Sequence, residues 1–174
     1  MSLNISELRI EGGTPLKGEV HVRGAKNLVP KAMVAALHGS TRSTLRNVPD
    51  LSDVEIVTTL VELHGAKVNY DPEAGILTLD PAQDAKTAAD NAEEIQLCGG
   101  NSRIPILMVG PLLHTLGTAR IPNLGGCKIG DRPIDYHMDA LRKFGAVVEK
   151  DDESGTTLNA PDEGLHGAEI ELNY

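Results

Sequence analysis

The sequence contains two copies of one pattern, and this internal repeat limits the possible folds more than any other feature. The segments HGAKVNYDPEAGILTL at 64–79 and FGAVVEKDDESGTTLN at 144–159 align without a gap, which places Gly65 on Gly145 and Gly75 on Gly155. In each copy a glycine ends a helical pattern, and two short β-type runs then flank a polar turn. The repeat therefore predicts two copies of one supersecondary unit.

Hydrophobic periodicity predicts the same order of elements in both copies. The first copy is expected to form a helix at 28–37, a strand at 44–48, a helix at 54–64 and a hairpin with strands at 67–70 and 76–79. The second copy is expected to form a helix at 104–114, a strand at 118–121, a helix at 133–144 and a hairpin with strands at 146–149 and 156–158. Two short strands at 8–10 and 19–22 precede the first copy, and the polar segment 81–91 connects the copies.

The second copy carries an insertion that the first copy lacks. Pro49 of the first copy aligns with Pro122 of the second. The offset in numbering between these two prolines is smaller than the offset between the two hairpins that follow them. Seven extra residues are therefore expected between Pro122 and Ile134. They fall inside the segment 117–137, GTARIPNLGGCKIGDRPIDYH, which combines a thiol, three basic side chains and four glycines without a helix or strand period. Because functional residues often lie on loops carried by a regular scaffold, this segment is the first place to look for chemistry.

Cys127 is the nucleophile candidate within this loop. Lys128 and Arg132 are cations that favour the thiolate, and the preceding glycines leave the sulfur accessible. Local features alone leave two interpretations open, a functional thiol and an incidental exposed cysteine. Cys98 lacks basic neighbours and is expected to be an inert residue near the start of a helix. Both cysteines are expected to be free thiols, because no CxxC spacing is present.

Several cationic or amide side chains precede expected helices. Lys26 and Asn27, in the motif GAKN, come just before an apolar helix, where backbone N–H groups and the helix dipole favour an anion such as phosphate; a merely solvated lysine is the alternative. Arg103 is expected at the equivalent place in the second copy, and Arg132 is followed by the rigid Pro133. Guanidinium groups suit forked contacts with phosphate oxygens. Together with the thiol, these residues indicate a site for a phosphorylated or diphosphate-bearing substrate.

Composition narrows the class of partner. The formal net charge is -9, and the chain has one Phe, three Tyr and no Trp, which argues against nucleic acid as a partner. The six histidines show no metal-binding spacing, so no metal site is expected. No apolar run is long enough to span a membrane, and the first residues lack a signal-peptide pattern; a cytoplasmic location without membrane association is expected.

The motifs GAKN, Arg103 ahead of ILMVGPLL, and the loop LGGCKIGDRPIDYHMDALRKFGA together resemble the MurA family, the UDP-N-acetylglucosamine 1-carboxyvinyltransferases, within the enolpyruvyl transferases. The resemblance covers essentially the whole chain. It implies transfer of enolpyruvyl from phosphoenolpyruvate to the 3-hydroxyl of UDP-N-acetylglucosamine, the first committed step of peptidoglycan synthesis, without a metal or organic cofactor.

The resemblance also implies roles for individual residues. Cys127 resembles the general acid that forms a covalent adduct with phosphoenolpyruvate and is alkylated by fosfomycin, on a loop that closes as a lid. Lys26 and Asn27 resemble the phosphoenolpyruvate contacts. The residues that resemble the UDP-sugar contacts are Arg103, Arg132, Pro133, Ile134, Asp135 and Tyr136. From the residues alone, Asp135 is either a ligand hydrogen-bond acceptor or a carboxylate at a helix start.

The fold implied by the resemblance is α+β, an inside-out barrel of repeated βαβαββ units. The chain would supply an N-terminal portion: strands within 1–25 that pack with a second domain in the family, a first unit at 26–97, and a second unit at 98–174 that carries the Cys loop 117–137. The third unit of the first domain and the second domain would be absent, so the isolated chain is expected to have little or no turnover. The alternatives are a non-catalytic sugar-nucleotide-binding module and an oligomer that forms through exposed sheet edges.

Overall fold

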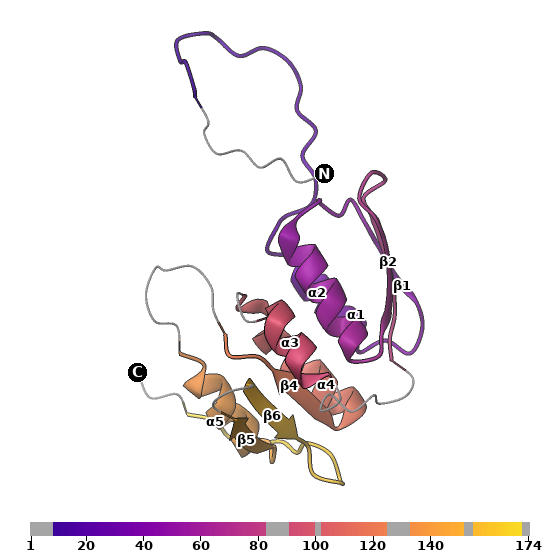
Figure 1. Ribbon diagram of the computed structural model, residues 1–174, viewed down its shortest axis with the longest axis vertical. Helices are drawn as coiled ribbons and strands as arrows, with labels where there is room; N and C mark the ends of the chain where they lie inside the picture. The colour runs from indigo at the N-terminus through magenta and orange to yellow at the C-terminus, as the bar shows by residue number, and fades with distance from the viewer. Residues whose placement is uncertain (1–8, 83–90, 100–101, 125–132, 152–154, 172–174) are drawn as a thin grey trace.

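The described residues form two three-stranded antiparallel sheets, with most of the helices between them. A computed structural model describes residues 9–82, 91–99, 102–124, 133–151 and 155–171. Figure 1 shows the first sheet beside helices α1 and α2 and the second sheet beside α3 and α4. This arrangement confirms the expected α+β class. Within the described residues, no helix is both long and apolar enough to cross a bilayer.

The first unit contains helices α1 (Val29–Ala36) and α2 (Ser52–Leu63) and strands β1 (Ser43–Arg46), β2 (Lys67–Asp71) and β3 (Ile76–Asp80). The sheet order is β1-β3-β2 with antiparallel pairs throughout. The predicted helices, strand and hairpin are all present, with ends shifted by at most a few positions. In α2 the side chains of Val54, Val57, Leu60 and Val61 are buried, which is the spacing of one helix face.

The second unit repeats this order, with helix α4 (Val109–Leu116), strand β4 (Thr118–Ile121), helix α5 (Asp135–Lys143), and strands β5 (Val147–Asp151) and β6 (Gly155–Asn159). The predicted helix at 104–114 is instead split into a 3₁₀ helix, η1 (Ile104–Met108), and α4. Pro111 explains the break, because it has no N–H to donate to Leu107 and fits only the first turn of a new helix.

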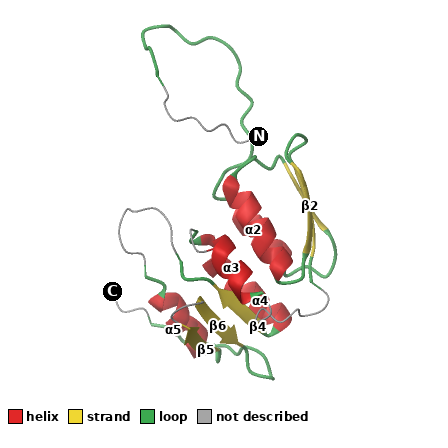
Figure 2. Cartoon of the chain, viewed as in Figure 1, coloured by secondary structure: helices red, strands yellow, loops and turns green. Residues whose placement is uncertain are grey.

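An additional helix, α3 (Ala92–Gly99), precedes η1 and was not predicted. Cys98 therefore lies near the end of a helix rather than near the start of one. In both units the described residues supply the αβαββ part of the expected unit (Figure 2).

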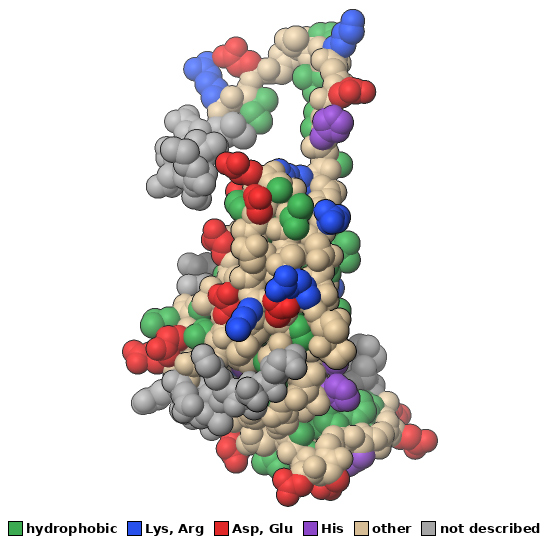
Figure 3. All heavy atoms as spheres, turned by 90° about the vertical axis from the view of Figure 1, so that its right-hand side faces the viewer, with side chains coloured by type: hydrophobic (Ala, Val, Ile, Leu, Met, Phe, Trp, Pro, Cys, Tyr) green, Lys and Arg blue, Asp and Glu red, His purple; other side chains and the backbone are tan. Residues whose placement is uncertain are grey.

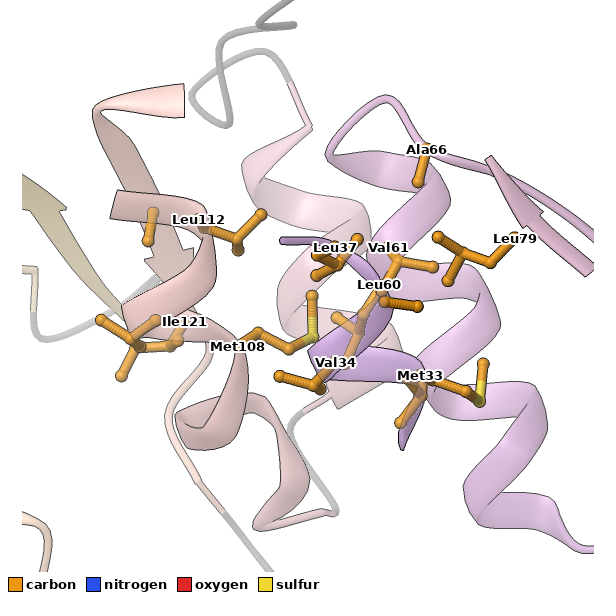
Figure 4. Packing of buried hydrophobic residues seen from close by; sticks show 14 of the residues in the cluster. Met33, Val34, Leu37, Leu60, Val61, Ala66, Leu79, Met108, Leu112 and Ile121 are labelled. Atoms are coloured by element: carbon orange, nitrogen blue, oxygen red, sulfur yellow. The ribbon is translucent and has the colours of Figure 1, made fainter. Parts of the chain in front are cut away.

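One hydrophobic core joins the two units. Figure 4 shows Met108 between Val34 of α1 and Leu37, which follows α1, on one side and Leu112 and Ile121 of the second unit on the other. Met108 is 1% exposed, and the neighbouring buried side chains belong to the same core cluster. Because side chains from both copies interdigitate, we expect the units to fold together.

The pairing register corrects the alignment of the two copies. The buried Leu79 of β3 corresponds to the buried Leu158 of β6. The ungapped alignment instead matches Leu79 with the residue that follows Leu158. On the neighbouring strands, Leu79 pairs with Ser43 of β1 and Leu158 pairs with Ala119 of β4. Gly155 thus opens β6 rather than lying in the turn before it. The connection from β4 to α5, 122–134, has thirteen residues against five, 47–51, from β1 to α2, a difference of eight where seven were expected.

The prediction of strands before the first unit is wrong for 19–22, and part of the segment 8–10 lies outside the described residues. No strand is present in 9–28, and the side chains of Leu16, Val20 and Val22 are between 82% and 99% exposed. Figure 1 shows this segment projecting away from the rest of the chain. A strand requires a neighbour for its backbone N–H and C=O groups, and none of the described strands pairs with this segment, so alternation alone does not produce one.

Candidate functional site

Lys26 lies in the turn before α1 and forms an ion pair with the first turn of α2. Its Nζ is 3.1 Å from Oδ2 of Asp53. The Lys26 side chain is 62% exposed, whereas that of Asp53 is 21% exposed. The structure therefore brings the predicted phosphate-binding lysine to the beginning of a second helix, next to a carboxylate that the sequence did not single out.

Arg23 fixes the backbone just before Lys26. Its guanidinium donates hydrogen bonds to the carbonyl oxygens of Val48, Pro72 and Glu73, at 3.2, 2.7 and 2.9 Å. Gly24 adds a backbone N–H bond of 2.9 Å to the carbonyl of Asn47 and has no room for a side chain, because a Cβ would lie 2.7 Å from that same oxygen. These contacts attach the GAKN motif to the β2–β3 turn and to the end of β1.

Asn27 is exposed and precedes Leu28, the N-cap residue of α1. Its carbonyl accepts a hydrogen bond of 2.8 Å from Nζ of Lys31. The backbone N–H groups of Leu28 and Val29 both donate to the carbonyl of Ala25. The expected placement of Lys26 and Asn27 at the start of an apolar helix is therefore correct.

Arg103 was expected to be the counterpart of Lys26 in the second copy, but the helix starts give it another counterpart. It precedes Val109, the first residue of α4, by the same interval at which Arg23 precedes Val29 of α1. The second copy thus matches Arg103 with Arg23 and not with Lys26. Arg103 is partly buried at the N-terminal end of η1, which packs against α1 and α2 at the junction of the units.

The remaining described UDP-sugar candidates lie at the start of α5. Ile134 precedes the helix and packs partly buried against the core, Asp135 is the first helical residue and is exposed, and Tyr136 is 44% exposed. Pro133 is exposed before the helix. Asp135 occupies the helix-start position that its alternative interpretation required, where a carboxylate is favourable.

The Cys loop is only partly described. Cys127 and Arg132 lie outside the described residues. At the beginning of the loop, the backbone N–H of Asn123 donates a hydrogen bond of 2.8 Å to Oε1 of Gln96 in α3. Helix α3 thereby fixes the point where the chain leaves β4, a contact that sequence reasoning missed because it did not predict that helix.

The structure divides the described candidates into groups rather than assembling them all in one cluster. Lys26 and Asn27 belong to the first unit, where α1 packs against α2, η1 and β1. The residues at the start of α5 belong to the far side of the second unit, where α5 packs on β5 (Figure 1). Asp53 and Arg23 were missed because both pair with residues distant in sequence, and only their charge signals a role.

Other charged and thiol groups are accounted for by local contacts. Burial raises the pKa of the Cys98 thiol, which a hydrogen bond with Thr59 only partly offsets, and this keeps the sulfur protonated as expected for an inert cysteine. Hydrogen bonding from Arg42 lowers the pKa of Asp80. On the face seen in Figure 3, basic and acidic side chains lie next to one another. Within the described residues, no three His, Cys, Asp or Glu side chains are grouped to hold a metal ion.

Comparison with solved structures finds a similar fold. The enolpyruvyl transferase NikO from Streptomyces tendae matches with a TM-score of 0.63 over 86% of this chain and 31% of its own, at 23% sequence identity. At that identity the match concerns the fold alone.

Sequence comparison is more specific. The chain is 40% identical over 170 residues to the UDP-N-acetylglucosamine 1-carboxyvinyltransferase of Protochlamydia amoebophila, which covers 96% of this chain and 36% of that protein. It is 40% identical over 171 residues to the protein of the same name from Acidiphilium cryptum, covering 98% and 38%. The chain thus spans less than two fifths of the length of these relatives. The family model described as EPSP synthase (3-phosphoshikimate 1-carboxyvinyltransferase) matches residues 10–174, and the chain therefore belongs to this family of enolpyruvyl transferases.

Proposed function

We propose that the chain forms part of a cytoplasmic enzyme that transfers enolpyruvyl from phosphoenolpyruvate to the 3-hydroxyl of UDP-N-acetylglucosamine. The observation that carries this proposal is the identity of 36–40% to proteins named for that reaction, which extends over 95% or more of the chain. In the reaction a C–O bond forms between the sugar hydroxyl, which loses its proton, and C2 of phosphoenolpyruvate; the C–O bond to phosphate breaks, and inorganic phosphate leaves with that proton. The product is an intermediate for peptidoglycan synthesis.

Each candidate residue then has a role. Lys26 and Asn27 bind the phosphoenolpyruvate anion at the start of α1, where the backbone N–H groups of the first turn add to the charge of the lysine. Cys127 supplies a proton to the methylene carbon of phosphoenolpyruvate and its sulfur bonds to C2 in a covalent adduct; this C–S bond breaks again and the methyl group loses a proton as the enolpyruvyl product forms. The UDP-sugar contacts are Arg103, Arg132, Pro133, Ile134, Asp135 and Tyr136, and the segment 117–137 closes over the bound sugar nucleotide.

Calorimetry and mass spectrometry test this proposal on the chain as it stands. We expect UDP-N-acetylglucosamine to bind measurably and fosfomycin to add once, on Cys127, with the Cys127→Ser variant unmodified. Cys98 serves as the internal control, because burial raises its pKa and keeps it unreactive. Binding of neither compound would contradict the proposal.

Turnover is a separate question. The relatives are more than twice as long as this chain, so we propose that the isolated chain binds ligand but releases little or no phosphate from phosphoenolpyruvate. A coupled phosphate-release assay measures this directly. Sustained release that depends on UDP-N-acetylglucosamine would show that the chain is catalytically sufficient.

Self-association is a second candidate function for the isolated chain. The exposed apolar side chains of Ile10, Leu16, Val20 and Val22 support it, because alternating apolar residues in an extended segment can pair with a sheet edge of another copy. Sedimentation velocity tests it: we expect a concentration-dependent dimer that the double variant Val20→Lys, Val22→Lys abolishes. A monomer at all concentrations would exclude it.

A further inference from the structure

We propose that Asp53 is a positioning residue for Lys26, holding its ammonium group where the anion of phosphoenolpyruvate binds. This inference deepens the proposed function and rests on it for the identity of the ligand. Asp53 itself does not contact the ligand in this proposal. It acts through the 3.1 Å ion pair between its Oδ2 and Nζ of Lys26.

The geometry fixes the lysine at both ends. The backbone just before it is anchored by the three carbonyl contacts of Arg23 and by the bond from Gly24 to Asn47. Its ammonium group is held by a carboxylate on the rigid first turn of α2. A lysine ammonium has three N–H donors, so donation to Asp53 leaves others for a second anion. A flexible four-carbon chain is thereby restricted before any ligand arrives.

Stability does not explain the pair. The Lys26 side chain is mostly exposed, and ion pairs of this kind contribute little to folding because solvent screens them and both side chains lose freedom. The pair matters more for binding an anion. Ordering a long lysine side chain opposes binding, and this cost is avoided when the side chain is ordered before the anion arrives. Lysine–carboxylate pairs orient the phosphate-binding lysine of protein kinases in the same way.

The internal repeat provides an independent comparison. The start of α1 corresponds to the start of α4, and the end of α2 corresponds to the end of α5. Counted from these helix ends, the second copy has Ile106 in place of Lys26 and Pro133 in place of Asp53. The second unit forms the same elements without either partner. The pair is therefore not needed to build the unit, and both members occur together in the copy that carries the GAKN motif.

The ligand-free chain provides the first test, through the rate at which a lysine-acylating reagent modifies Lys26. Peptide mass spectrometry measures this rate relative to Lys31, which is tied to Asn27 instead. We expect Asp53→Asn to raise the relative rate about two- to threefold, as loss of an exposed ion pair permits. The matched control is Asp139→Asn, which removes the carboxylate of an exposed pair with Arg142 on α5 and is expected to leave the Lys26 rate unchanged. An unchanged rate in Asp53→Asn would overturn the ion pair as a restraint.

Calorimetric titration with phosphoenolpyruvate provides the second test. Asp53 can either position Lys26 or merely neutralise its charge, and these two roles predict opposite changes in affinity when the carboxylate is removed. If Asp53 positions Lys26, Asp53→Asn weakens binding about three- to tenfold, because the lysine is no longer ordered in advance. If Asp53 merely neutralises the lysine, its removal strengthens binding of an anion, and the inference fails.

A double-mutant cycle separates positioning from a structural role. In the Lys26→Ala background, Asp53→Asn is expected to have no further effect on phosphoenolpyruvate affinity, whereas damage to α2 would weaken binding in both backgrounds and overturn the inference. A second outcome is that Asp53→Asn changes the labelling rate of Lys26 but the wild-type chain does not bind phosphoenolpyruvate. This outcome would contradict the proposed ligand, and with it the positioning role. The two failures are therefore distinguishable.

Discussion

Gly155 occupies a position that only glycine can fill. Its φ is +109°, and a Cβ there would collide with the carbonyl oxygen of Ile121 and lie 3.0 Å from Cα of Pro122. Both obstacles are backbone atoms at the end of β4, which cannot move without breaking the pairing with β6. We expect Gly155→Ala to destabilise the chain by about 3 kcal/mol, through strain and overpacking together, measured by urea denaturation.

Gly164→Ala is the matched control for this prediction. Gly164 also has a positive φ, +85°, but a Cβ there meets nothing within 4 Å. Its replacement should therefore cost only the backbone strain, about 1 kcal/mol. Equal losses in the two variants would show that the approach of β4 to Gly155 has no energetic importance.

Helix α2 ends in a buried histidine that contacts the second unit. His64 is 2% exposed, and its Nδ1 lies 2.7 Å from the carbonyl oxygen of Leu60. Burial lowers the pKa of His64, and the backbone groups of Leu60 and Arg120 offset this only in part. Arg120 belongs to β4, so the end of α2 lies against the second sheet.

The sign of the resulting pH dependence follows from proton binding. At neutral pH His64 is uncharged in both the folded and the unfolded chain. Below its ordinary value of about 6.5 the unfolded chain binds a proton that the folded chain does not, so stability falls as the pH falls. We expect a slope of at most about 1.4 kcal/mol per pH unit from this residue, measured by urea denaturation from neutral to mildly acidic pH.

Two histidine variants isolate this effect. His64→Gln should remove the part of the slope that begins near the ordinary histidine pKa of about 6.5. His21→Gln replaces an exposed histidine in the projecting N-terminal segment and should leave the slope unchanged. A slope that persists in His64→Gln would assign the pH dependence to other groups.

The order of elements could be predicted from sequence because it depends on local patterns. Hydrophobic periodicity located α2 and both hairpins, and glycines marked the helix ends before them. Helix α3 was missed because a polar segment and two glycines surround it. The one-residue register difference in the second hairpin could not be seen, because an ungapped alignment matches Gly75 with Gly155 by identity alone.

The site was predictable only where function lies in contiguous motifs. Lys26 and Asn27 were found from their place before an apolar helix. Asp53 was not found, because its partner Lys26 is distant in sequence. Acidic residues are also common in the first turn of a helix, so its position alone does not indicate a site. Arg103 was matched with Lys26 from its place before a helix, whereas the helix starts in the structure match it with Arg23.

At the scale of the whole molecule, Met108 tests whether the two copies form one cooperative unit. It is 1% exposed and lies between side chains of α1 and those of the second unit (Figure 4). Met108→Ala would leave a cavity at this junction, for which we expect a loss of about 2–5 kcal/mol. Because the cavity lies between the copies, both should be destabilised together in a single transition, followed by circular dichroism during urea denaturation.

Hydrogen exchange distinguishes cooperative from independent units. If the core is shared, Met108→Ala should lower amide protection in β3 and in β6 alike, since each sheet rests on helices that contact the junction. The control Leu107→Ala alters the neighbouring residue, which is 36% exposed, and should cost less than about 1 kcal/mol. Loss of protection in β6 with β3 unchanged would mean that the first unit is stable alone. The repeat would then be a pair of separate folding units, and Lys26, Asn27 and Asp53 would keep their arrangement without the second copy.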